Sequence, residues 1–110
     1  MNEAVARALA HSLATALAEA RFTDALACTT SRYQKTHSAQ DLRLAFEQFC
    51  RPDIEITKIE TDDFVEETSQ GALMVHVYVF RGDNEPEELA VFVEDGSAGA
   101  SVRDIWFGRP

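Results

Sequence analysis

The sequence predicts an α+β fold in which N-terminal helices pack on one face of a curved, antiparallel, four-stranded meander sheet. Two observations predict it. Apolar residues recur at intervals of three or four up to residue 50 and at every second position from residue 53 onwards. Short turn-forming stretches also separate the segments of the second half, as expected where consecutive strands pair as hairpins. The length of 110 residues predicts one domain over residues 1–110.

The first half of the chain predicts three helices, at about 3–20, 22–28 and 38–50. The first has alanines and leucines at helical spacing, which leaves His11 on the exposed side. The polar stretch TTSRYQKTH, residues 29–37, is expected to be a connection. Ser38 and Asp41 have the spacing of a capping box, and Pro52 is expected to stop the third helix.

The second half predicts four strands, at about 54–62, 72–81, 87–95 and 100–107. The first is expected to fray where its acidic residues accumulate. The stretches GDNEP (82–86) and GSAG (96–99) have the composition and length of hairpin turns.

Alternation in LMVHVYVF divides the second strand between two environments. Its aliphatic odd positions suit packing against the helices, whereas Met74, His76, Tyr78 and Phe80 would form an outer face. Phe92 extends that face in one hairpin register, with Trp106 or Phe107 doing so on the last strand. An aromatic face with polar edges is typical of a dimer or partner interface.

The net charge of -9 is unevenly distributed. Residues 1–52 have six Lys/Arg against five Asp/Glu, and residues 53–110 have four against fourteen. Nucleic acid and anionic lipid both favour clustered Lys and Arg, so we expect neither as a partner. The acidic half is either a solvated surface or an attraction for a basic protein partner.

No apolar run approaches the roughly 18 residues of a membrane span. Cys28 and Cys50 lie among apolar residues without a CxxC spacing. They are therefore interpreted as buried thiols of a cytoplasmic protein, with one disulfide between them as the alternative.

The segments AEARFTDALAC and SAQDLRLAFEQF, followed by a meander that ends in IWFGRP, are similar in order to the nuclear transport factor 2-like (SnoaL-like) superfamily of cystatin-like fold. The resemblance implies a sheet wrapped around the first helix as a cone, often with a pocket at its wide end, and homodimers through the exposed sheet face. Members include isomerases, cyclases and dehydratases as well as non-catalytic proteins. Residues 3–20 lack the tyrosine that the ketosteroid isomerases have on their first helix.

Candidate site residues are few. His76 is interpreted as part of the interface face, with a pocket base or a buried histidine as alternatives. Asp62 and Asp63 are either a carboxylate at the cone mouth or a solvated acidic turn. If the resemblance holds, Tyr33 and Trp106 could line a ligand pocket; otherwise they are rim or interface aromatics. The spacing of the three histidines predicts no metal site, and no cofactor is expected.

These observations predict a non-catalytic domain that dimerises through its sheet and binds a small apolar ligand or a protein partner. One alternative is a small isomerase, cyclase or dehydratase with an Asp or His general base. Another is an acidic, immunity-type or chaperone-type binder of a basic protein.

Overall fold

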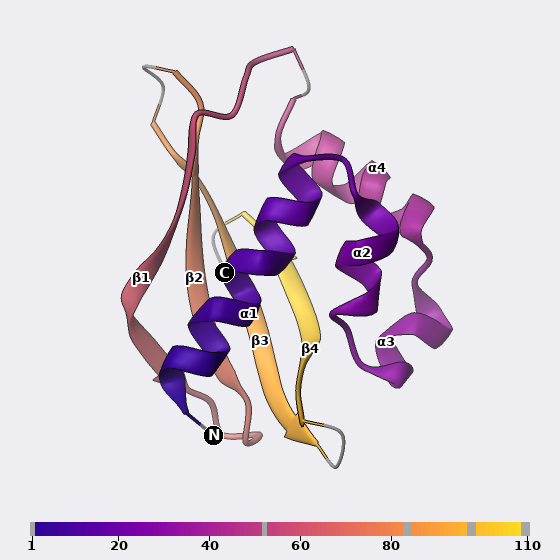
Figure 1. The fold of residues 1–110 in the computed structure, drawn as a ribbon, viewed down its shortest axis with the longest axis vertical. Coiled ribbons are helices and arrows are strands. Elements are labelled where there is room, and N and C mark those ends of the chain that lie inside the picture. The colour runs from indigo at the N-terminus through magenta and orange to yellow at the C-terminus, as the bar shows by residue number, and fades with distance from the viewer. Residues whose placement is uncertain (1, 52, 83–84, 97–98, 109–110) are drawn as a thin grey trace.

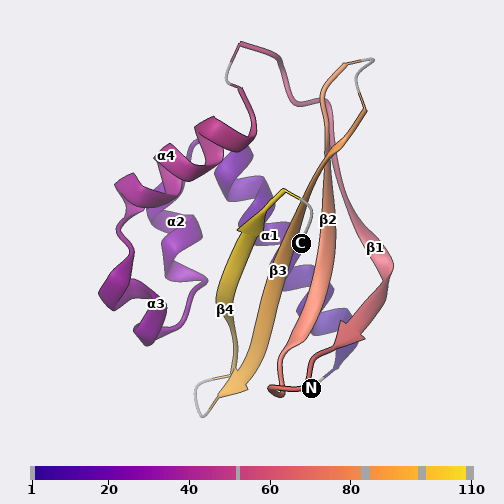
Figure 2. The same ribbon diagram turned by 180° about the vertical axis from the view of Figure 1, so that it is seen from behind.

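The computed structural model describes residues 2–51, 53–82, 85–96 and 99–108. Helices precede strands, and the helices lie on one face of the sheet, as Figures 1 and 2 show from opposite sides. The α+β class expected from the sequence is therefore confirmed. The elements are α1 Glu3–Ala18, α2 Phe22–Ala27, α3 Ser31–Thr36, α4 Ala39–Phe49, β1 Lys58–Glu67, β2 Leu73–Phe80, β3 Glu87–Gly96 and β4 Gly99–Phe107.

The strands form an antiparallel meander in the order β1-β2-β3-β4. Strands β1 and β4 are the two edges, so the sheet is open. Register sets the outer face, because Phe92 pairs with Met74 and His76 pairs with Ala90, which in turn pairs with Trp106. Directly paired residues lie on the same face of a sheet, so the outward orientation expected for Phe92 is confirmed.

Helix α1 crosses the inner face of the sheet and contacts all four strands (Figure 1). It begins at Asn2, whose side-chain Oδ1 accepts a hydrogen bond from the Ala4 N–H at 2.7 Å. Its buried stripe is mainly alanine, which lets the helix lie close to the sheet. Odd positions of β2 pack beneath it, with Val75, Val77 and Val79 fully buried. The division of β2 between aliphatic and aromatic faces is therefore as the alternation predicts.

The outer strand β4 is partly covered by the chain between α2 and α3. The Thr30 N–H donates to the Val102 carbonyl, and the Val102 N–H donates to the Cys28 carbonyl, each at 2.8 Å. At the opposite edge of the sheet, β1 has acidic residues along most of its length, which discourages pairing with another strand.

Two expectations are wrong. The polar stretch predicted as a connection contains α3, whose N-terminus is capped by the Thr30 side chain and whose Tyr33 is buried. One large apolar residue is too few for a helical period. Strand β1 spans 58–67 and not 54–62. Its register with β2 shifts between Thr61 and Val65, across the acidic Asp62 and Asp63, and pairing resumes at Val65.

Other expected boundaries hold to within a few residues. The capping box of α4 is present, with the Asp41 N–H donating to Ser38 Oγ and the Ser38 N–H donating to the Asp41 carboxylate. Helix α4 ends at Phe49; Pro52, expected to stop it, lies outside the described residues. The same is true of residues 83–84 and 97–98 in the two predicted turns.

Candidate ligand-binding cleft

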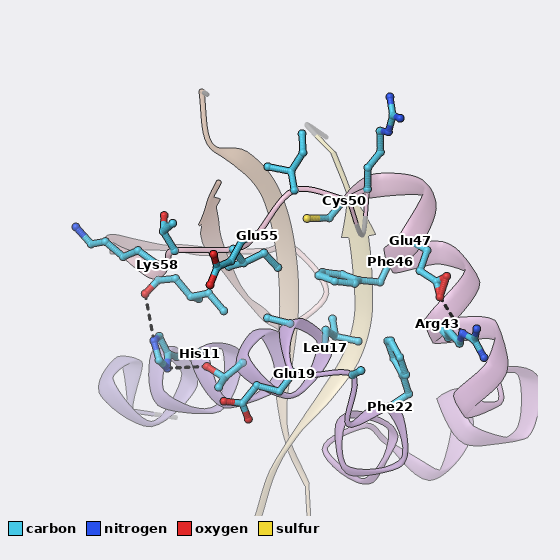
Figure 3. A pocket seen from close by; sticks show the side chains of 18 residues that line it. His11, Leu17, Glu19, Phe22, Arg43, Phe46, Glu47, Cys50, Glu55 and Lys58 are labelled. Atoms are coloured by element: carbon cyan, nitrogen blue, oxygen red, sulfur yellow. Dashed lines mark hydrogen bonds and ion pairs between the residues drawn. The ribbon is translucent and has the colours of Figure 1, made fainter. Parts of the chain in front are cut away.

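A cleft with a volume of about 830 Å³ opens between α1, α4 and the segment that leads into β1. Figure 3 shows its lining from close by. The last turn of α1 and the last turns of α4 form two walls, and residues 54–59 form a third. The volume lies in the range of roughly 300–1,000 Å³ that is typical of small-molecule sites.

The inner lining of the cleft is apolar. Leu17, Phe46 and Cys50 are buried and form its floor. Four apolar side chains around this floor are only partly buried: Phe22, Ile54, Ile56 and Ile59. Partly exposed aliphatic side chains around a concave floor leave apolar surface that a bound molecule could remove from water.

One polar connection holds a wall of the cleft in place. His11 on α1 lies with its Nε2 3.2 Å from the Ile59 carbonyl oxygen on β1. Since a carbonyl only accepts, Nε2 donates this bond. The His11 Nδ1 lies 3.5 Å from the Thr15 hydroxyl one turn further along α1. His11 thus joins the helix to the edge strand that borders the cleft.

The rim is charged, and most of its charges are already paired. Arg43 Nε donates to Glu47 at 2.8 Å. Arg51 pairs with Asp53, and Lys58 pairs with Glu60. Burial raises the pKa of the Cys50 thiol in the floor, so it stays protonated and is a poor nucleophile.

The residues proposed from the sequence as bases lie elsewhere. Asp62 and His76 are on the outer face of the sheet, and Asp63 is exposed and lies 3.4 Å from Arg7 on α1. None of the three is among the residues that line the cleft. Asp62 accepts hydrogen bonds from the Phe64 N–H and the Tyr78 hydroxyl, and these bonds lower the pKa of its carboxyl group.

The outer face does bring several of the expected interface residues together. His76 Nδ1 lies 3.4 Å from Glu88 Oε1, and both side chains are largely buried. Phe92 and Trp106 have ring centroids 4.7 Å apart, and the Trp106 indole N–H donates to Asp104. Trp106 is 45% exposed on this face, away from the cleft.

Tyr33 is buried and also lies outside the cleft lining. Its ring stacks on His37, with centroids 3.9 Å apart. Burial is the main reason why the pKa of its hydroxyl rises to about 12. Neither aromatic proposed for a ligand pocket therefore lines this one.

Sequence reasoning missed most of the cleft. The helical spacing of Leu17 and Phe46 predicts core positions, His11 is expected on the exposed side of its helix, and residues 54–57 are expected in a strand. Ile54 and Ile56 before β1 and Ile59 within β1 are visible in the sequence as apolar residues. Only the course of the chain before β1, away from the sheet, places Ile54 and Ile56 on a wall of the cleft. Among residues 2–51, 53–82, 85–96 and 99–108, no three His, Cys, Asp or Glu side chains are grouped as metal ligands would be.

Comparison with known proteins found no matching family model, no matching curated protein and no matching solved structure. Within the described part of the chain, none of the helices has the length and apolar character needed to span a membrane.

Proposed function

We propose that this protein is a non-catalytic binding domain that holds a small, mainly apolar molecule in the cleft between α1, α4 and residues 54–59. The observation that carries the proposal is the cleft itself, with an apolar floor and half-buried isoleucines inside a polar rim. Small-molecule sites have this combination of an apolar lining and few polar groups.

The placement of the titratable groups favours binding over the enzymatic alternative. An isomerase, cyclase or dehydratase would need a carboxylate or imidazole facing the substrate. Asp62, Asp63 and His76 are outside the cleft lining. His11 lines it, but its Nε2 donates to the Ile59 carbonyl and its Nδ1, the nitrogen that could act as a base, lies beside the Thr15 hydroxyl.

Calorimetric titration with neutral alkanols tests the proposal. Each methylene that enters an apolar site contributes about 0.8 kcal/mol, so octanol should bind roughly tenfold more tightly than hexanol, at one site per chain. Ala18 lines the cleft, and Ala18→Phe should weaken octanol binding at least about tenfold by filling the site.

A matched control is available on the same helix. Ala8 is exposed and lies outside the cleft, so Ala8→Phe adds the same ring without changing the site. The proposal is wrong if octanol fails to bind the unmodified protein, or if Ala18→Phe and Ala8→Phe bind it equally well.

We also propose that two copies of the chain pair through the outer face of the sheet. Its half-buried Met74, Tyr78, Phe80 and Phe92, with Trp106 beside them, have the composition of an interface centre. Acidic residues of β1 and β3 surround this centre, as polar residues surround the centre of most interfaces.

Sedimentation equilibrium tests the pairing. The unmodified protein should have a dimeric mass at micromolar concentration, and Phe92→Asp should make it monomeric by burying a charge in the interface. Leu44→Asp, on the exposed side of α4, is the control that should leave the dimer intact. A monomeric mass for the unmodified protein would contradict the proposal.

The likeness to nuclear transport factor 2-like domains stays a prediction, as do a cytoplasmic location and a basic protein partner. Free Cys28 and Cys50 thiols fit a reducing compartment. The partner hypothesis is favoured only by the excess of acid after residue 52. It would require binding that weakens steeply with added salt.

A further inference from the structure

The cleft has an electrostatic potential of one sign, and the C-terminal ends of two helices contribute to it first. Leu17, Ala18 and Glu19 at the end of α1 line the cleft, and so do Phe46 and Glu47 in the last turns of α4. The C-terminal end of a helix has the equivalent of about half a negative charge. Neither α1 nor α4 has a basic residue in its last turn to offset it.

The end of α1 also leaves backbone acceptors beside the cleft. Ala20 and Arg21 close the helix by donating to the carbonyls of Leu17 and Ala16. Among the described residues, no backbone N–H donates to the carbonyl oxygens of Ala18 and Glu19. These two residues are part of the cleft lining.

The rim adds an acid with no cationic partner. Each of its basic side chains has a carboxylate within ion-pair distance, as described above for Arg43, Arg51 and Lys58. Glu19 is paired with Arg21, which is not among the residues that line the cleft. Within the part of the chain that the structure describes, Glu55 forms no ion pair, and Figure 3 shows it with Glu19 among the side chains around the opening.

One buried cation lies near the cleft, but it does not reverse the negative charge that faces it. Arg81 is 7% exposed, close to Cys50, and does not line the cleft. Its Nη2 donates to Glu87 at 2.9 Å, so the pair is neutral. The uncompensated charge that faces the cleft is therefore negative.

Resting on the binding function proposed above, we infer that the ligand is a cationic amphiphile: an apolar body that occupies the floor, with a protonated amine at the mouth beside Glu55 and the end of α1. The amine would donate to the free carbonyls and face the unpaired carboxylate. The apolar body would cover the three isoleucines and Phe22.

Three probes with the same alkyl chain separate charge from apolar contact: octylammonium, octanol and octanoate. At low salt, octylammonium should bind roughly tenfold more tightly than octanol, and octanoate more weakly than octanol. Added salt should reduce the advantage of the amine and leave octanol unaffected. Equal affinities for the three, or a preference for octanoate, would overturn this inference while the binding function stands.

Two charge-matched variants test whether the amine binds beside Glu55. Glu55→Gln should weaken octylammonium about threefold and leave octanol unchanged. Glu66→Gln removes the same charge from β1, where Glu66 pairs with Met74 on the outer face, and should have little effect. Equal effects of the two variants would mean that net charge alone attracts the amine, and would overturn the inference. Failure of all three probes to bind would instead refute the binding function.

Discussion

Replacing Ala20 by glycine should make the protein more stable, because the methyl group of Ala20 is unfavourable at this position. Ala20 has a φ of +60°, the only positive φ at a described non-glycine residue. It follows the C-cap Glu19 and forms a Schellman motif, with the Ala20 N–H donating to Leu17 and the Arg21 N–H donating to Ala16. Glycine is the usual residue at this position because it has no Cβ.

The magnitude follows from two opposing effects. Relieving the left-handed conformation should lower the free energy of the folded state by about 1–2 kcal/mol. Glycine also gives the unfolded chain more freedom, which offsets about 0.4–1 kcal/mol. Ala20→Gly should therefore stabilise the protein by roughly 0.5–1 kcal/mol.

Urea unfolding followed by circular dichroism measures the difference. With a slope of roughly 1–3 kcal/mol per molar for a small domain, the midpoint should rise by a few tenths of a molar with unchanged slope. Ala8→Gly, in the exposed interior of α1, is the control and should lower stability by about 1 kcal/mol. If both variants lower stability, the reasoning about strain at Ala20 is wrong.

Four further predictions concern stability. Burial raises the pKa of the Tyr33 phenol from 10.0 to about 12, so the stability that the neutral phenol contributes is complete below about pH 10 and is lost towards pH 12. Tyr33→Phe should remove this loss of stability at alkaline pH. Phenolate absorbance and alkaline unfolding measure the difference. Ser38→Ala should cost about 1 kcal/mol in urea unfolding by removing the cap of α4. The hydrogen bonds from Ser38 lower the pKa of the Asp41 carboxyl, so Asp41→Asn should weaken the loss of stability as pH falls through that pKa in acid titration. Leu13→Ala, at a fully buried position of α1, should cost about 2–5 kcal/mol.

Local patterns predicted much of the fold. The alternation in β2 was sufficient to assign Val75, Val77 and Val79 to the core and Met74 to the other face, because period-two patterning maps directly onto the two faces of a sheet. The spacing of Ser38 and Asp41 fixed the start of α4 for a similar reason, since the capping box is made within four residues.

The candidate site could not be predicted in the same way, because its walls are distant in the sequence. Leu17 at the end of α1, Phe46 in α4 and Ile56 before β1 meet only through tertiary packing. Each of them reads locally as a core residue, and no local pattern separates a core position from the lining of a cleft. The boundary of β1 was missed for a related reason, since Ile54 and Ile56 before the strand have the alternate spacing that is typical of a strand.

A backbone amide NMR titration with octanol tests whether the cleft binds an apolar molecule. We expect one saturable set of shifts confined to the end of α1, the last turns of α4 and residues 54–59, with the outer-face residues around Phe92 unchanged. Ala18→Phe should abolish that set. Shifts centred on the outer face, or no saturable shifts at all, would contradict the claim that this cleft binds an apolar molecule.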